Sequence, residues 1–101
     1  MDLPGEGTLE LLYVELVGES TAAAAPAVVA GARAAWGRAP GCRGLQGRLE
    51  HDGRRLLLLT VWTDVGARDA WRNSPAGQAW WSEQAARGAR TARSLWSADP
   101  S

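Results

Sequence analysis

The sequence predicts a single α+β domain in which the elements follow the order β-α-β-β-α-β, the order of a ferredoxin-like fold. Three observations lead to this prediction. The chain has 101 residues, which is enough for one hydrophobic core but too few for two. Residues 8–18 have the composition of a buried strand. Asp52-Gly53 separates two further strand patterns at the centre of the chain.

The first half of the domain is predicted to be a strand followed by a helix. Residues 1–7 are rich in glycine and acidic residues, so we expect a flexible lead before a single domain over residues 8–97. Residues 8–18 are apolar at nearly every position, as in a central strand with both faces covered. An amphipathic helix follows and ends by Pro40-Gly41. Because proline has no backbone N–H, we expect the regular part of this helix to begin near Pro26.

The centre of the domain is predicted to be a β-hairpin over residues 42–50 and 54–62. Asp52-Gly53 favours a two-residue type I′ turn, in which both central residues have positive φ. The resulting register sets Leu49 opposite Leu56 and divides the side chains between two faces. One face is nearly apolar and ends at Trp62. The other face suits a contact between subunits because it mixes polar and apolar residues, namely Gln46, Arg48, Glu50, Arg55, Leu57, Leu59 and Val61.

The second half is predicted to contain a broken helix and a last strand. Asp64 can cap a short helix, and Ser74-Pro75 has the residues of an N-cap and a first helical position, so we expect a break at Asn73. The second part of the helix is expected to end at Gly88, before a strand over residues 89–96. Residues 98–101 are assigned to a C-terminal tail.

The composition argues against several classes of partner. Basic and acidic residues number 11 each, so we expect no attraction to nucleic acid or to an anionic membrane. Apolar runs are shorter than the roughly 20 residues of a membrane span. A lone cysteine, Cys42, excludes an internal disulfide, and the first residues do not resemble a signal peptide. A cytoplasmic protein is expected.

The chain also offers few residues for cofactor chemistry. His51 is the only histidine and adjoins the predicted turn, which argues against histidine-based metal sites. The sequence contains no dinucleotide-binding glycine motif, P-loop or nucleophile elbow. We therefore expect neither a metal nor an organic cofactor.

Tryptophan is the unusual component of this sequence, with six residues beside one tyrosine and no phenylalanine. Tryptophan side chains fill cores, but each buried indole also brings an N–H that needs an acceptor. A pocket for a flat, oxygenated aromatic molecule would use both properties. A polycyclic ligand is thus the specific hypothesis, and plain core packing is the alternative.

Several short motifs resemble the antibiotic biosynthesis monooxygenase family. They are Pro40-Gly41-Cys42 at the start of a strand, a strand that ends in Val61-Trp62, and Ala70-Trp71 followed by Asn73-Ser74-Pro75. Their order agrees with the predicted elements over residues 8–97. The resemblance implies a dimeric α/β barrel, in which two sheets pack face to face, and a pocket between the helices and the apolar sheet face. It also implies cofactor-free oxygenation, in which the substrate itself passes an electron to oxygen.

The resemblance assigns the catalytic position to Trp62. Some members carry an asparagine on the same strand where Leu58 stands here, so an amide that would position the substrate is missing. Many members have a helix histidine where Trp71 stands, and its loss argues against haem degradation. The family fold also supports polyketide cyclases, which act by orienting a reactive chain.

Three functions therefore remain open: a cofactor-independent oxygenase of an aromatic polyketide-type intermediate, a polyketide cyclase, and a non-catalytic ligand-binding barrel. Each would take a small aromatic or polyketide ligand and form a homodimer. Arg43 is expected opposite Trp62, where it could meet an anionic substrate. Tyr13 and Asn73 could also line the pocket, but each has a simpler alternative role: Tyr13 in the core and Asn73 as a helix cap. The candidate substrate-binding residues are Tyr13, Trp36, Arg43, Leu58, Trp71, Asn73 and Trp81.

Overall fold

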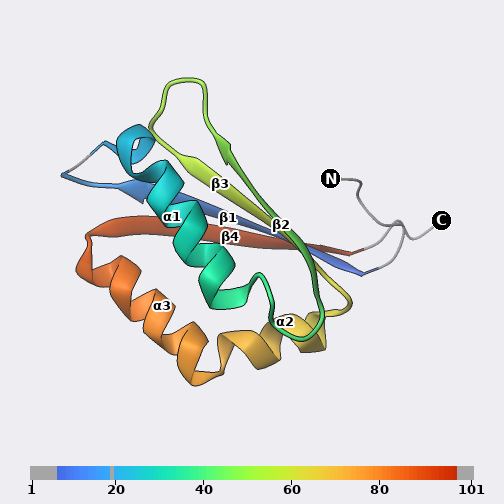
Figure 1. Ribbon diagram of the computed structural model, residues 1–101. Coiled ribbons are helices and arrows are strands. Elements are labelled where there is room, and N and C mark those ends of the chain that lie inside the picture. The colour runs from blue at the N-terminus through green and yellow to red at the C-terminus, as the bar shows by residue number, and fades with distance from the viewer. Residues whose placement is uncertain (1–6, 19, 98–101) are drawn as a thin grey trace.

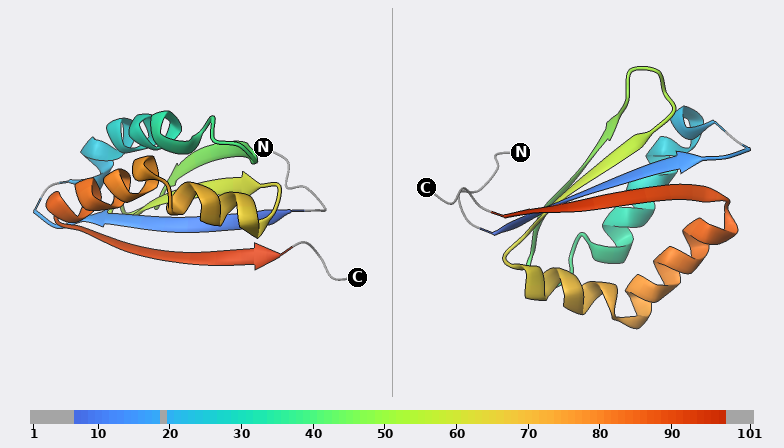
Figure 2. Two further views of the ribbon diagram at one scale, coloured as in Figure 1. Left: turned by 90° about the horizontal axis from the view of Figure 1, so that it is seen from below. Right: turned by 180° about the vertical axis from the view of Figure 1, so that it is seen from behind.

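The structure, a computed structural model, describes residues 7–18 and 20–97. The predicted lead, apart from Gly7, and the predicted tail lie outside the described residues. Four strands form one antiparallel sheet in the order β2-β3-β1-β4. The strands are β1 (Thr8–Leu16), β2 (Cys42–Leu49), β3 (Leu56–Trp62) and β4 (Ala89–Ser97). The helices α1 (Thr21–Trp36), α2 (Val65–Arg72) and α3 (Pro75–Ala86) lie on one side of this sheet (Figures 1 and 2). The predicted α+β, ferredoxin-like fold is confirmed.

The hydrophobic core lies between the sheet and the helices. On β1 the side chains alternate, so that Leu12, Val14 and Leu16 are buried towards the helices while their neighbours are half-buried on the other face. Leu58 of β3 and Ala32 of α1 complete the centre of this core. Of the helices in the described residues, none lies on the other face of the sheet (Figure 2). No described helix is long and apolar enough to span a membrane.

Helix α1 differs from the sequence prediction at its start. It begins at Thr21, after the N-cap Ser20, whose hydroxyl accepts a hydrogen bond from the Ala23 N–H at 3.2 Å. Pro26 lies inside the helix, so the predicted start near Pro26 is wrong. Proline deprives the Ala22 carbonyl of its usual helical partner. Both residues are exposed, and water can satisfy that carbonyl at little cost.

The hairpin has the predicted register but a different turn. Leu49 pairs with Leu56, as predicted. Among the described residues only glycines have positive φ, so Asp52 does not, and the type I′ assignment is wrong. The loop is wider and is closed by a hydrogen bond from Gly53 N–H to the Glu50 carbonyl at 2.8 Å. Asp52 acts through its carboxylate, which accepts a hydrogen bond from the Arg54 N–H at 2.9 Å.

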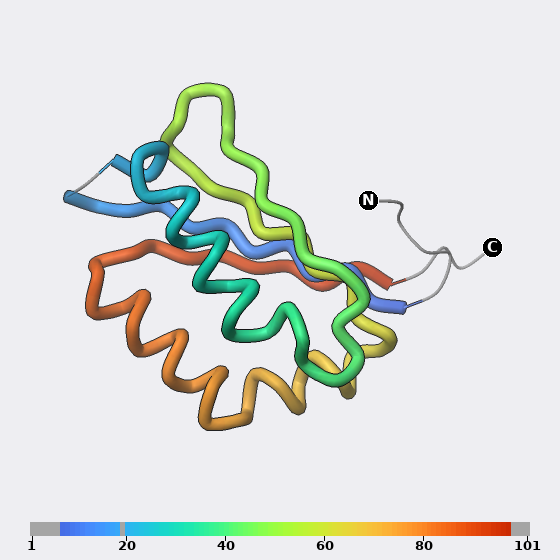
Figure 3. Tube along the Cα trace, in the orientation of Figure 1, coloured from blue at the N-terminus to red at the C-terminus, as the bar shows by residue number. Residues whose placement is uncertain are grey.

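The predicted break between the second and third helices is confirmed, and the chain trace bends there (Figure 3). Asp64 caps α2 by accepting from the Ala67 N–H at 2.8 Å, and Asn73 is the C-cap of α2. Ser74 caps α3, with Pro75 at the start of that helix. Two successive caps leave α2 and α3 as separate helices against one sheet.

Two glycines offer a test of this packing. Gly41 has φ of 85°, and a methyl group on it would overlap Ala67 of α2 and approach Thr63 Oγ1 to 2.9 Å. Gly31 is exposed within α1, and a methyl group there would meet nothing within 4 Å. We predict that Gly41→Ala destabilises the fold by at least about 2 kcal/mol, through backbone strain and overlap. Gly31→Ala should stabilise it by about 0.5–1 kcal/mol.

Urea unfolding followed by circular dichroism measures both changes in free energy. Equal effects of the two substitutions would contradict the close approach of Gly41 to α2.

Candidate functional site

A chain of five indole rings runs through the helix side of the sheet. Trp62, at the end of β3, stacks on Trp71 of α2 with centroids 6.4 Å apart. Trp71 lies 4.7 Å from Trp36, and Trp36 lies 5.0 Å from Trp80 in an edge-to-face arrangement. Trp80 in turn meets Trp81 at 5.2 Å. Aromatic pairs at such distances add about 0.5–1.5 kcal/mol each beyond area burial. The chain thus joins the sheet to all three helices.

Two of these indoles find simple acceptors for their N–H groups. Trp36 Nε1 donates to Thr60 Oγ1 at 3.0 Å, which ties α1 to β3. Trp71 Nε1 donates to the Ala35 carbonyl at 3.0 Å, near the end of α1. These bonds replace the hydrogen bonds to water that the two indole N–H groups lose on burial. Both tryptophans therefore fit the core-packing interpretation as well as a binding role.

Trp62 has a different partner, a buried carboxylate. Its Nε1 donates to Glu10 Oε1 at 3.2 Å, while Arg68 Nε donates to Glu10 Oε2 at 2.8 Å. Glu10 and Arg68 are only 7% and 5% exposed, and Trp62 is 0% exposed. A buried charge must be paired and hydrogen-bonded to be tolerated. Glu10 meets this requirement by joining β1 to α2 and to the indole of Trp62.

The charge of Arg68 is stabilised on two sides. Burial lowers the pKa of the Arg68 guanidinium, but hydrogen bonds to Asp69 and Glu10 outweigh it, so its pKa lies above the usual value. The bond to Asp69 Oδ1 is 2.9 Å long, and that carboxylate is half exposed. Arg68 therefore stays charged and keeps a positive group beside Glu10.

The sequence prediction missed Glu10 and Arg68. The signal was present in the alternation of β1, where Glu10 shares the inner face with Leu12, Val14 and Leu16. A carboxylate on an otherwise apolar face needs a partner from another element. Helix α2 supplies one, because Arg68 is its buried residue.

Four of the predicted site residues lie together. Trp62, Trp36 and Trp71 are consecutive members of the indole chain, and Leu58 lies four positions before Trp62 on the same face of β3, fully buried. Trp81 lies at the other end of the indole chain, on α3. These residues form the wall of the helix-side core rather than an open cavity.

Three other predicted residues lie elsewhere. Tyr13 is half-buried on the opposite face of the sheet, with the Arg55 guanidinium 5.2 Å from its ring. The predicted pairing of Arg43 with Trp62 is wrong, because a bulge shifts the register so that Cys42 pairs with Trp62. Arg43 is exposed at that bulge. Asn73 is also exposed and caps α2, as the simpler interpretation predicted.

Helix α3 holds two buried polar atoms without hydrogen-bond partners among the described residues, Trp81 Nε1 and Gln84 Oε1. Each unpaired buried group costs about 1–3 kcal/mol. Gln84 contributes to the wall of a groove of about 420 Å³ between α1 and α3, whose other lining residues include five alanines, Trp80, Glu83 and Arg87. A donor and an acceptor thus stand unused one helical turn apart.

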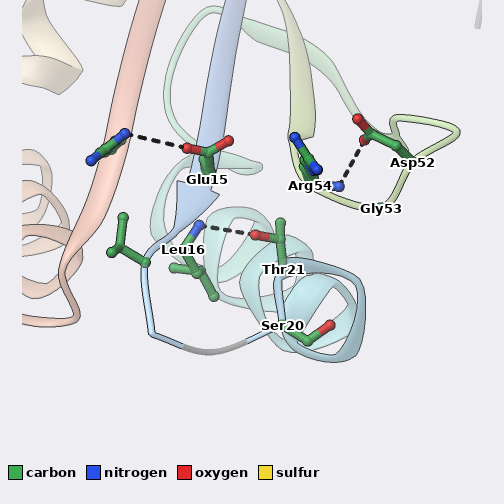
Figure 4. A pocket seen from close by; sticks show the side chains of 9 residues that line it. Glu15, Leu16, Ser20, Thr21, Asp52, Gly53 and Arg54 are labelled. Carbon is green, nitrogen blue, oxygen red and sulfur yellow. Dashed lines mark hydrogen bonds and ion pairs between the residues drawn. The ribbon is translucent and has the colours of Figure 1, made fainter.

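A surface cavity of about 460 Å³ lies at the far end of the sheet from Trp62 (Figure 4). The end of β1, the start of α1 and the hairpin enclose it. Several of its polar groups are already engaged: Thr21 Oγ1 accepts from the Leu16 N–H at 2.9 Å, and Glu15 pairs with Arg90 at 3.9 Å. Another cavity, of about 540 Å³, lies beside the end of α1, next to Arg33 and Leu45. Trp62 lines neither of these cavities nor the groove.

Within residues 7–18 and 20–97, no group of three or more histidine, cysteine or acidic side chains is arranged to hold a metal ion. The thiol of Cys42 is half-buried, and burial raises its pKa above the usual value. The site is thus built from indoles and one buried ion pair.

Comparison with known proteins agrees with this architecture. The family model described as antibiotic biosynthesis monooxygenase matches residues 12–83, which is most of the chain. The chain belongs to the antibiotic biosynthesis monooxygenase family. The matched segment contains Trp62, Arg68 and Trp71, while Glu10 lies just before it. No curated protein matches the sequence significantly.

Solved structures share the fold of this family member at low sequence identity. SnoaB from Streptomyces nogalater, a cofactor-independent oxygenase, has a TM-score of 0.75 and 20% identity, with 94% of this chain and 96% of that chain covered. Rv0793 from Mycobacterium tuberculosis has a TM-score of 0.74 and 17% identity, with 93% and 97% covered. The hydroxynitrile lyase from Passiflora edulis has a TM-score of 0.76 and 10% identity, with 97% and 98% covered.

These structures differ in activity, so the shared fold does not decide the reaction of this family member. The side chains at the site must do so.

The buried ion pair is open to a direct test. Removing Arg68 leaves the buried Glu10 carboxyl with the Trp62 N–H as its one remaining hydrogen-bond partner among the described residues. Removing Glu10 leaves Arg68 paired with Asp69. We predict that Arg68→Leu destabilises the fold by about 3–5 kcal/mol, that Glu10→Leu costs less, and that the double variant costs less than the sum of the two.

Urea unfolding of the four proteins in the cycle gives these values. Arg55→Leu is the control, because Arg55 forms a similar two-bond pair with Glu50 at the surface, with bonds of 2.8 and 2.7 Å. Arg55→Leu should lose far less stability, because its ion pair is exposed to solvent. If Arg68→Leu cost no more than this control, the structural role of the buried pair would be refuted.

Proposed function

We propose that this protein is a cofactor-independent oxygenase that acts in the cytoplasm on an aromatic, polyketide-type intermediate of secondary metabolism. Family membership and the likeness to SnoaB support an oxygenase. The main observation is the Glu10 carboxylate, fixed by Arg68 and bonded to the indole of Trp62. A basic group beside the assigned catalytic tryptophan fits a reaction that begins with proton removal.

In this proposal Glu10 accepts a proton from the reacting carbon of an anthrone-type substrate. The resulting carbanion passes one electron to O2, and the two radicals then form a carbon–oxygen bond. Glu10 returns its proton to the peroxide, which loses water to leave a ketone. One oxygen atom enters the product and the other leaves as water. The substrate supplies all four electrons that O2 receives, so no further reductant is needed.

The group that positions the substrate cannot be the asparagine amide found in some family members, because this chain has Leu58 at that position. Leu58, at the position where some members have asparagine, is fully buried among apolar neighbours. It offers no hydrogen bond to a substrate. We assign the positioning of the substrate oxygen to Arg68. Its positive charge stabilises the negative charge that develops on that oxygen beside Glu10.

The test is oxygen uptake by the purified protein with an anthrone-type substrate, followed with an oxygen electrode and mass spectrometry of the product. We expect one O2 consumed per ketone formed. A new ring without oxygen uptake would refute the oxygenase and favour a polyketide cyclase. Neither reaction, together with quenching of tryptophan fluorescence by polycyclic ligands, would favour a non-catalytic binding protein.

A substitution at Trp62 tests the site within the same assay. Trp62→Phe removes the N–H that bonds to Glu10, and we predict a fall in kcat/KM of about tenfold or more, equivalent to roughly 1.4 kcal/mol. Trp80→Phe is the control, because Trp80 is also buried in the indole chain, while the indole that bonds to Glu10 is that of Trp62. It should keep its turnover. Equal turnover of the two variants would remove Trp62 from the mechanism.

We also propose that the protein forms a homodimer through the sheet face without helices. By register, this open face carries Leu11 of β1, Leu59 of β3 and Trp96 of β4, and Trp96 is 56% exposed. An exposed apolar sheet face of this kind is typical of a subunit contact. The mixture of polar and apolar residues predicted for β2 and β3 supports the same interpretation.

A charge in the middle of this face should prevent the contact. Wild-type protein is expected to be a dimer by light scattering, and Leu59→Arg a folded monomer, because an arginine would be buried there without a partner. Val65→Arg is the control, at an exposed apolar position of α2 on the helix side. A monomeric wild type, or a Leu59→Arg variant that remains dimeric, would overturn the proposal.

A further inference from the structure

The inner face of β4 is left partly uncovered by the helices. Arg93 pairs with Leu12 and Leu95 pairs with Glu10, so both side chains point to the helix side of the sheet. Their partners on β1 are buried, yet Arg93 is exposed and Leu95 is 41% exposed. Helix α3 leads into this edge strand at its C-terminal end and diverges from the rest of it (Figure 1). A polar and an apolar side chain are thus accessible next to the buried Glu10.

Arg93 is held against an aromatic ring rather than a carboxylate. Its guanidinium lies 5.4 Å from the ring centroid of Trp81. In the described part of the chain, no carboxylate lies within ion-pair distance of Arg93. A guanidinium that lies over an indole keeps its N–H groups free to receive a planar anion. The Trp81 N–H, for which residues 7–18 and 20–97 provide no acceptor, lies in the same region.

The charges around Arg93 are unbalanced. Burial, followed by the charges of Arg72 and Arg68, lowers the pKa of Arg93 below its usual value. The two carboxylates that act in the opposite direction, Glu10 and Asp69, both bond to Arg68. Arg72 and Arg93 therefore keep positive charges that no described side chain neutralises. An anion bound between α3 and β4 would balance this excess.

We infer that Arg93 and Trp81 bind a carboxylate group of the aromatic substrate, with the apolar body of the substrate against Leu95 and its reacting carbon towards Glu10. This inference rests on the proposed function and specifies its substrate class. A carboxylate can accept two parallel hydrogen bonds from one guanidinium, which sets both position and orientation. In this inference Arg93 is the specificity-determining residue for the substrate.

The sheet geometry also limits the size of the substrate. Arg93 and Leu95 are two positions apart on one strand, and Glu10 lies one strand away from Leu95. With about 3.4 Å per residue and about 4.8 Å between strands, the backbone positions of Arg93 and Glu10 are roughly 8 Å apart. A carboxylate separated from the reacting carbon by about two fused rings spans this distance.

Binding of 2-naphthoate, compared with its neutral analogue 2-naphthamide, tests this inference by titration calorimetry on the full chain. We expect naphthoate to bind wild type at least about tenfold more tightly than naphthamide, and Arg93→Gln to lose this preference while it binds naphthamide as before. Arg90→Gln is the matched control, because Arg90 is exposed on the same strand but on the open face. It should keep the preference.

Three results would overturn the inference: no preference for naphthoate in wild type, equal loss of both ligands in Arg93→Gln, or loss of the preference in Arg90→Gln. The oxygen-uptake assay separates this failure from that of the proposed function. Oxygen uptake without a naphthoate preference would refute the carboxylate site alone. A preference that depends on Arg93, without oxygen uptake, would refute the oxygenase and support an anion-binding site.

Discussion

The ion pair between Glu10 and Arg68 is the constraint on which the rest of the structure depends. A carboxylate on the inner face of the central strand is tolerable only with a partner, and that partner comes from α2 at 2.8 Å. The pair therefore fixes α2 over the sheet, and Trp62 is oriented by its bond to the same carboxylate. The stacking of Trp71 on Trp62 then carries this order into the indole chain.

Local sequence chemistry predicted most of the fold. Asp64 and Ser74 have the side chains that cap helices, and both caps are present. The hairpin register followed from alternation, and Leu49 pairs with Leu56 as predicted. Three details depended on context instead: water access allows Pro26 within α1, a wider loop leaves Asp52 at negative φ, and a bulge displaces Arg43. Each detail depends on tertiary structure, so the local preferences of the residues do not predict it.

The candidate site was less predictable because it depends on pairs between distant elements. The tryptophans were visible by composition, and Trp62, Trp71 and Trp36 do lie together. Glu10 and Arg68 are 58 positions apart, and a sequence shows two such charges without their contact. Arg93 was passed over for a similar reason, since only the register of β1 with β4 sets it on the helix side.

The indole chain also has an optical consequence. Rings 4.7 to 6.4 Å apart exchange excitation energy, so Trp62, Trp71, Trp36, Trp80 and Trp81 absorb and emit as a coupled group. Trp96, which is exposed on the open face with its N–H bonded to Ser94, belongs to no such pair among the described residues. One fluorescence spectrum therefore monitors two regions. Emission from the coupled tryptophans depends on the helix-side core, and emission from Trp96 depends on the open face.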